Sequence, residues 1–184
     1  PASRDDADAH ELALRQFETC RTMTDRIAAL AAIVNSHHPH QTAALEAFYR
    51  QWRDEDLVVG KWFTLQGTSR LPGGLARVQA LMRHPAFDIR MPNHVRSLIG
   101  AFSQSNPVNF HAGDGAGDRF LADRAVELNG INPQIAARML TALTTWRRYE
   151  PHRQALMRAA LEQVAETAGL SPDVYEVATK ALAA

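Results

Sequence analysis

Apolar residues recur at spacings of three and four along the whole chain, whereas runs that alternate apolar and polar residues are hard to find. Positions three and four apart share one face of an α-helix, so this period is typical of amphipathic helices. One such stripe consists of Ile135, Met139, Leu143 and Trp146. The pattern predicts an all-α protein.

Polar residues that favour helix starts stand before several of these stripes. Ser171 precedes Pro172 and Asp173, and Asn132 precedes Pro133; a third start is expected at Thr24. Further helices are expected around residues 5–20, 40–53, 56–67, 74–83, 92–104 and 117–129, which with the stripe from His152 gives about nine or ten helices.

The breaks between these helices are short and carry Gly, Pro, Asn or His, and no Pro-, Gly- or Ser-rich linker divides the chain. Short connections place successive helices antiparallel and side by side. Two architectures satisfy this arrangement, a closed bundle and an open stack of helix pairs, the α-solenoid. Helix number and loop length favour the solenoid, with residues 1–184 forming a single domain.

The composition excludes several classes of function. The chain is 46% hydrophobic and 22% charged, and its 20 basic residues balance 20 acidic ones, so no net positive field draws it to nucleic acid or to an anionic membrane. Cys20 is the single cysteine, and PASRDDADAH does not resemble a secretory signal. We expect a cytoplasmic location, with neither a nucleic-acid nor a membrane partner.

The sequence contains one histidine cluster that could hold a metal ion. His37, His38 and His40 stand on a loop around a proline and could act as ligands, although no Asp, Glu or Cys stands close by. His10 and Glu11 begin like the zinc-protease pattern H-E-x-x-H, but position 14 is leucine. Neither a catalytic residue nor a metal ligand is predicted.

A glycine-rich segment, HAGDGAG at residues 111–117, precedes an expected helix. Such a helix start can bind phosphate. Here no lysine follows in the required position, no strand precedes the segment, and Asp114 would repel an anion. We interpret the segment as a sharp turn between helices, capped by Asp114.

Two helix faces have an unusual composition. Opposite the apolar stripe that follows Pro133, the polar residues are Gln134, Arg138, Thr141 and Thr145. Uncharged hydrogen-bonding groups around one arginine suit the wall of a water-filled channel. On the helix from Pro92, the flank reads Arg96, Gly100 and Ser103, where small residues leave room for another backbone or a ligand. Arginine can bind a carboxylate through two parallel hydrogen bonds.

Four segments resemble the carboxy-terminal domain of the bacterial aminopeptidase N family of zinc metallopeptidases. They are PNHVRSLIGAFSQSNPVNFHAGDGAG (92–117), NPQIAARML (132–140), KWFTLQGTS (61–69) and RQALMRAALEQV (153–164). Their order and spacing match, and the similarity runs from about Phe17 to Leu182. One departure is Asp118, where the family commonly has an aromatic residue.

The resemblance implies an armadillo/HEAT-like superhelical stack of antiparallel helix pairs that closes over a zinc-binding catalytic domain and encloses a chamber. The zinc ligands and catalytic groups of the family lie outside these 184 residues, so no cofactor is expected in this chain. By position, the resemblance implies that Gln134 lies near the pocket for the first substrate side chain, that Arg138 faces the peptide beyond it, and that Arg96 lines the chamber.

Three hypotheses about function follow. The first is the carboxy-terminal part of a zinc-dependent aminopeptidase, inactive alone, whose partners are the catalytic domain and peptides. The second is a free-standing α-solenoid that binds a partner protein; an upstream reading frame encoding H-E-x-x-H would eliminate it. The third is metal storage through His37, His38 and His40.

Overall fold

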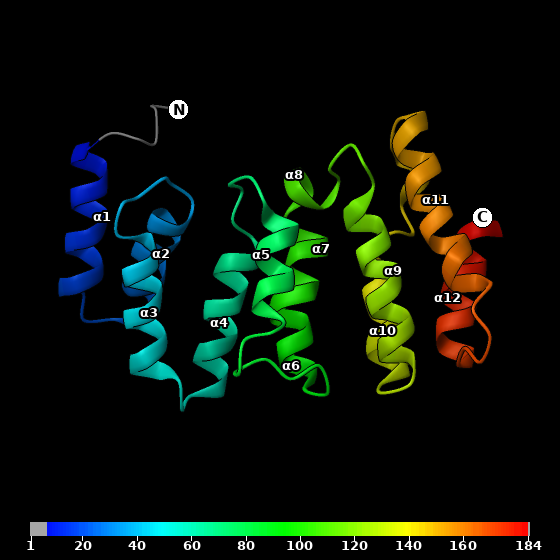
Figure 1. Ribbon diagram of the computed structural model, residues 1–184, viewed down its shortest axis with the longest axis horizontal. Helices are drawn as coiled ribbons and strands as arrows, with labels where there is room; N and C mark the ends of the chain where they lie inside the picture. The colour runs from blue at the N-terminus through cyan, green and yellow to red at the C-terminus, as the bar shows by residue number, and fades with distance from the viewer. Residues whose placement is uncertain (1–6, 184) are drawn as a thin grey trace.

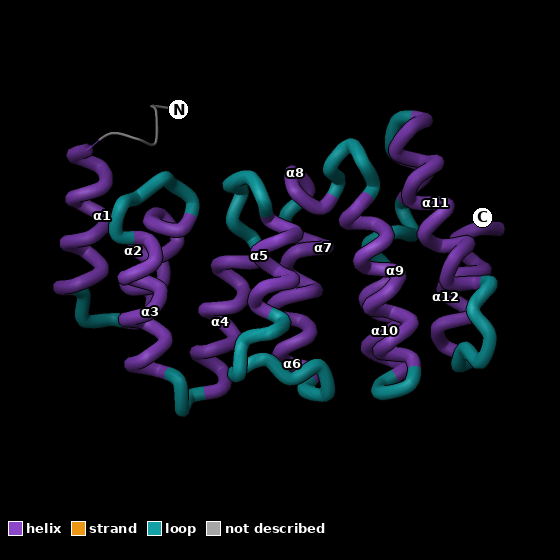
Figure 2. The backbone as a smooth tube through the Cα atoms, viewed as in Figure 1, coloured by secondary structure: helices purple, strands orange, loops and turns teal. Residues whose placement is uncertain are grey.

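The computed structural model describes residues 7–183, and its regular elements within that range are all helical (Figure 2). The α-helices are α1 (Ala7–Thr19), α2 (Met23–Val34), α3 (Gln41–Trp52), α4 (Asp56–Gly67), α5 (Gly74–Leu81), α6 (Pro92–Val95), α7 (Ala101–Ser105), α8 (Pro107–Phe110), α9 (Ala116–Asn129), α10 (Pro133–Leu140), α11 (Pro151–Ala165) and α12 (Pro172–Ala183). A π turn spans Arg96–Gly100, and a 3₁₀ turn spans Trp146–Arg148. The all-α prediction is confirmed; the first two residues expected in the 5–20 helix lie outside the described range.

The helices form an open stack rather than a closed bundle (Figure 1). Successive pairs are α1 with α2, α3 with α4, α5 with the α6–α7 rod, α9 with α10, and α11 with α12. The first members form one row and the second members form the other, which we call the second row. Its contacts run from α2 to α4, from α4 to the π turn, and from α10 to α12. Because α1 and α12 lie at opposite ends of the stack, the solenoid alternative is confirmed.

The core lies between the two rows. Phe48, Phe63, Phe102 and Phe110 are each at most 1% exposed, and the predicted stripe from Ile135 to Trp146 is buried as expected. The indole Nε1 of Trp146, in the turn after α10, donates to the Ala181 carbonyl of α12 at 2.9 Å and thereby joins the fourth pair to the fifth. No helix in residues 7–183 combines the length and apolar character needed to cross a membrane.

The helix predicted from Pro133 is shorter than its pattern suggested. It ends at Leu140, so Thr141 and Thr145 belong to the following turns rather than to a continuous helical face. The hydroxyl of Thr141 donates to the Arg138 carbonyl at 2.7 Å, and that of Thr144 donates to the Thr141 carbonyl at 2.9 Å. Such local bonds compete with the helical ladder, which explains the early end.

Two smaller differences concern the start of α2 and the presence of a short extra helix. The second helix begins at Met23 rather than at Thr24, because the Thr22 hydroxyl accepts the Asp25 amide at 3.1 Å and caps it. The four-residue helix α8 was not predicted from the pattern. With the α6–α7 rod taken as one helix, α8 accounts for the excess of the described helices over the expected nine or ten.

The α6–α7 rod packs closely on α4 in the second row. A Cβ on Gly67 would lie 3.1 Å from the Leu98 carbonyl oxygen, so glycine permits this approach. The Thr64 hydroxyl lies 3.0 Å from the carbonyl oxygens of both Gly60 and Ser97. A π turn alters the backbone bonding inside a helix, and the hydroxyl from α4 provides a donor for one of its carbonyls.

Candidate functional site

Arg96 and Arg138, predicted independently on two helices, line the same cleft of the second row. The cleft has a volume of about 310 Å³ and lies between α4, the α6–α7 rod and α10. Its walls consist of Thr64, Arg96, Ser97, Gly100, Ala101, Gln104, Ser105, Arg138 and Met139. We call this space the Arg96–Arg138 cleft.

The two arginines are held by different local structures. Arg138 lies in the last turn of α10, whose first turn is capped by Asn132 through a 3.1 Å bond from the Ile135 amide to Oδ1. Its exposed guanidinium makes no hydrogen bond or ion pair with any residue of the described chain. Arg96 opens the π turn and donates to the side-chain oxygen of Asn93. Both guanidinium groups therefore keep donors for a ligand.

The electrostatics of the cleft favour an electron-rich ligand. Neither aspartate nor glutamate contributes to its walls, whose polar groups are two guanidiniums, three hydroxyls and the Gln104 amide. Guanidinium binds carboxylate and carbonyl oxygens, and its charge persists across the physiological pH range. Among the residues that line the cleft, no nucleophile is paired with a base.

Gln134 lies apart from this cleft. It is exposed on α10, one turn before Arg138 on the same helical face, and it does not contribute to the cleft wall. The structure therefore brings together two of the three predicted site residues. Gln134 lies on a helix of the second row but does not line the Arg96–Arg138 cleft.

The small residues on the flank of the α6–α7 rod leave room for a side chain of the neighbouring helix α10 as well as for a ligand. A Cβ on Gly100 would lie 3.5 Å from the sulfur of Met139, which reaches it from α10. Ser103 is buried, and its hydroxyl donates to the Gly100 carbonyl at 3.3 Å. Of this flank, Arg96 and Gly100 line the cleft, whereas Ser103 does not.

The histidine loop does not form a metal site in the structure. His38 is buried, its Nδ1 accepts the His40 amide at 3.0 Å, and its Nε2 lies 2.9 Å from the His10 carbonyl oxygen. Both ring nitrogens are therefore occupied by the backbone. Across residues 7–183, no group of three or more His, Cys, Asp or Glu side chains is arranged to hold a metal ion.

The glycine-rich segment forms the sharp turn that its sequence indicates. Gly115 has a φ of +68°, a conformation that glycine adopts readily. The Asp114 carboxylate accepts the Ala116 amide at 3.0 Å at the start of α9, and Arg119 donates to the Asp114 carbonyl at 2.8 Å. The aspartate thus occupies a helix-start amide that a phosphate would need.

Sequence reasoning missed the buried partner of Asp118. This carboxylate is 0% exposed and lies 2.8 Å from Nη1 of Arg153, which is also buried. Arg153 further donates to the carbonyls of His111 and Ala112 at 2.6 and 2.7 Å. Arg153 therefore joins α11 both to Asp118 on α9 and to the glycine-rich turn.

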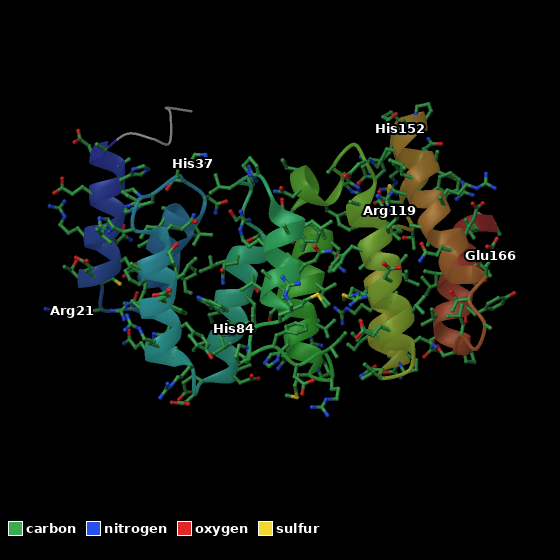
Figure 3. All side chains as sticks on the ribbon, in the orientation of Figure 1. Arg21, His37, His84, Arg119, His152 and Glu166 are labelled. Carbon is green, nitrogen blue, oxygen red and sulfur yellow. The ribbon has the colours of Figure 1, made fainter. Side chains whose placement is uncertain are left out.

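A separate arginine-lined cleft, of about 600 Å³, opens between α5 and α9 in the other row. Arg83, Arg119 and Arg124 contribute to its walls together with Asp123; Arg119 is labelled on α9 in Figure 3. Arg124 is paired with Glu127 at 2.7 Å, and Asp123 accepts the Gln163 amide at 2.8 Å. This cleft and the Arg96–Arg138 cleft lie on opposite faces of the junction between the third and fourth helix pairs.

Comparison with known proteins agrees with this architecture. A family model described as a domain of unknown function (DUF3458_C) with ARM repeats matches residues 2–183. Aminopeptidase N of Escherichia coli is 45% identical over 175 residues, which make up 95% of this chain and 20% of that protein. Aminopeptidase N of Caulobacter vibrioides is 43% identical over 169 residues, or 92% of this chain and 20% of that protein.

A solved structure shows the same fold. Legionella pneumophila aminopeptidase A in complex with aspartic acid has a TM-score of 0.91 and 34% identity, covering 96% of this chain and 21% of that one. The chain thus spans about one fifth of the length of these relatives and matches the carboxy-terminal helical domain of aminopeptidase N. It belongs to the DUF3458_C family of ARM-repeat domains.

Proposed function

We propose that this chain acts as the carboxy-terminal helical domain of a zinc-dependent, cytoplasmic aminopeptidase, where it closes the catalytic chamber and binds peptide. The observation that carries the proposal is the convergence of Arg96 and Arg138 on one cleft whose walls contain no acid. The aminopeptidases to which the chain is similar remove residues from peptide amino termini, as their names state.

In this proposal the chain contributes binding and not the metal chemistry. The described residues offer no cluster of ligands for zinc, and H-E-x-x-H does not occur in the sequence, so the metal would be held by another part of the enzyme. The catalytic domain of the same polypeptide is accordingly the proposed partner. Alone, the chain is expected not to hydrolyse aminoacyl anilides.

The role of the arginines follows from their donors. Arg138 and Arg96 bind main-chain carbonyls of the peptide or the carboxylate of a short one, and Gln134 shapes the pocket for the first side chain. A peptide longer than one residue presents such oxygens, whereas a chromogenic amino-acid anilide lacks them beyond its scissile bond. Loss of an arginine should therefore affect the two substrates differently.

In the complete enzyme, Arg138→Ala should raise the KM for dipeptides and tripeptides about tenfold, because losing one hydrogen bond to a charged group weakens the affinity by about that factor. The KM for an amino-acid anilide should change little. Steady-state kinetics on both substrates would measure the difference, with Arg83→Ala in the other row as the matched control. Equal increases for both substrates would contradict a peptide-binding role.

A further inference from the structure

We infer that the peptide-binding surface extends beyond the Arg96–Arg138 cleft into a second cleft, where Arg70 binds a carboxylate of the same peptide. The inference rests on the proposed function and specifies its substrate class, which is extended peptides that carry an acidic group. That group is either an Asp or Glu side chain or the carboxy-terminal carboxylate. Four observations carry it.

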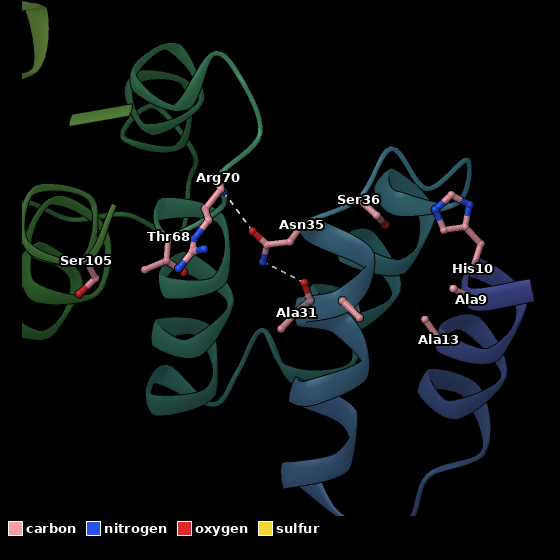
Figure 4. A pocket seen from close by; sticks show the side chains of 10 residues that line it. Ala9, His10, Ala13, Ala31, Asn35, Ser36, Thr68, Arg70 and Ser105 are labelled. Atoms are coloured by element: carbon pink, nitrogen blue, oxygen red, sulfur yellow. Dashed lines mark hydrogen bonds between the residues drawn. The ribbon is translucent and has the colours of Figure 1, made fainter. Parts of the chain in front are cut away.

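The first observation is the space itself. A cleft of about 630 Å³ opens where α1, α2 and the ends of α4 and α7 meet (Figure 4). This volume lies in the range of small-molecule and peptide-side-chain sites. Its walls consist of Ala9, His10, Ala13, Ala31, Ala32, Asn35, Ser36, Thr68, Arg70 and Ser105. Four alanines leave the room that an extended main chain requires.

The second observation is continuity with the Arg96–Arg138 cleft. Ser105, at the end of α7, lines both spaces. Thr64 of α4 lines the Arg96–Arg138 cleft, and Thr68, which caps the carboxy-terminal end of α4 one turn later, lines the second cleft. A ligand that leaves the Arg96–Arg138 cleft along α4 therefore enters the second cleft, whose opposite wall is formed by α1.

The third observation is that most polar groups of the second cleft are already satisfied. Asn35 accepts the Arg70 amide at 3.0 Å and donates to the Ala31 carbonyl at 2.9 Å. Ser36 donates to the Ile33 carbonyl at 3.1 Å, and Thr68 donates to the Thr64 carbonyl at 2.8 Å. These bonds shape the walls and leave few donors for a ligand.

The fourth observation concerns the Arg70 guanidinium. Its backbone is fixed by Asn35, but the side chain makes no hydrogen bond or ion pair with any described residue (Figure 4). The guanidinium lies beside Thr68, within the cleft. Neither aspartate nor glutamate lines this cleft or the adjoining one. Along this surface the arginines at 70, 96 and 138 therefore face a ligand without competing acids, as suits a carboxylate.

Isothermal titration of the 184-residue chain with matched octapeptides tests the inference. The peptides are alanine-rich, carry one glutamate at each of positions four to eight in turn, and have glutamine counterparts and carboxy-terminal amides. For at least one position of the glutamate, or for the free carboxy terminus, the charged peptide should bind about fivefold more tightly than its neutral counterpart. This is the effect expected of one partly exposed hydrogen bond between charged groups. Whether the preference follows the glutamate or the free carboxy terminus identifies which group supplies the carboxylate.

Arg70→Gln should abolish this preference while leaving the neutral peptides unchanged, and Arg83→Gln should retain it; circular dichroism verifies that each variant is folded. A preference that survives Arg70→Gln, or that appears for no peptide of the series, would overturn the inference. Equal competition by an oligothymidylate would overturn it as well, because the site would then accept any anion. Arg138→Gln tests the proposed function separately: it should weaken every peptide alike, and its failure to do so would contradict that function while leaving the Arg70 preference measurable.

Discussion

At the scale of single residues, the ion pair of Asp118 and Arg153 is a buried contact away from the proposed binding surface. Both side chains are buried, at 0% and 6% exposure, and they join α9 to α11. The second carboxylate oxygen of Asp118 and Nδ1 of His111 lie 3.6 Å apart, and neither has a hydrogen-bond partner in the structure. The stability of this region therefore depends on one carboxylate.

Asp118→Asn should lower the free energy of unfolding by about 3 kcal/mol, because a buried arginine would lose its charged partner. Urea denaturation followed by circular dichroism measures the change. Glu162→Gln is the matched control, since it removes an exposed partner of Arg158 at 2.8 Å and should cost less than about 1 kcal/mol. Similar losses of unfolding free energy in both variants would show that burial does not determine how much the Asp118–Arg153 pair stabilises the fold.

The sequence could indicate which residues share a face but not what covers that face. Helical spacing correctly placed Arg96 and Arg138 on exposed positions, because period and exposure are local properties. It could not show that Met139 would fill the space beside Gly100, since that contact joins two helices far apart in sequence. The position of Arg70 in a cleft could not be predicted for the same reason, because that cleft is formed by α1, α2 and the ends of α4 and α7 together.

At the scale of elements, the close approach of α8 to α9 depends on Gly117. A Cβ built at this position would lie only 2.0 Å from the Phe110 carbonyl oxygen. The obstacle is backbone, which cannot move aside as a flexible side chain can. The sequence marked this region as a glycine-rich turn, but which glycine was sterically required became clear only from the packing.

Gly117→Ala should therefore destabilise the fold by about 3 kcal/mol, as overpacking against fixed atoms does. Thermal denaturation provides the measurement. Gly113→Ala, in the same segment, is the control: no atom lies within 4 Å of its added Cβ and its φ is not positive, so its stability should stay close to that of the wild type. A well-tolerated alanine at position 117 would contradict the tight approach.

Element ends and irregular turns were the least predictable features. The apolar stripe continued past Leu140 because Leu143 and Trp146 remain buried, although the helix itself had ended. In the rod from Pro92, the pattern predicted a helix but not its π turn, which is stabilised by contacts from α4. In both cases tertiary contacts altered the backbone while leaving the burial pattern intact.

At the scale of the whole molecule, the pH dependence of stability has an identifiable contributor in His84 (Figure 3). Burial lowers the pKa of this imidazole from its ordinary value, because desolvation disfavours the charged form. The ring packs against Tyr49 and Trp62 at centroid distances of 4.8 and 5.1 Å, and its Nδ1 accepts the Ala86 amide at 3.1 Å. The folded chain therefore binds a proton at His84 less readily than the unfolded chain does.

Since the unfolded chain binds the extra proton, the free energy of unfolding should fall as the pH drops through about 6.5, the ordinary pKa of histidine, and level off below the folded pKa. Urea denaturation between pH 8 and pH 5 measures this dependence. In His84→Asn, which keeps a side-chain acceptor for the Ala86 amide, the decrease should be smaller. Coincident pH curves for the two proteins would contradict the assignment.

The architecture as a whole was the most predictable level. Helical periodicity and short connections are repeated along the entire chain, so errors at individual ends did not accumulate, and the stack of pairs emerged as expected. The choice between a bundle and a solenoid depended on whether the first and last pairs meet, which local patterns do not encode. The location of the clefts was likewise a property of the completed stack.

The junction between the third and fourth pairs also has a mechanical consequence. Its contacts include Phe102, whose ring centroid lies 5.7 and 6.1 Å from those of Phe110 and Phe120, and Met139, which packs against Gly100. One arginine-lined space opens on each side of these contacts. A rigid tilt of one half of the stack about these contacts would narrow one space while widening the other, so the volumes of the two clefts would change in opposite directions.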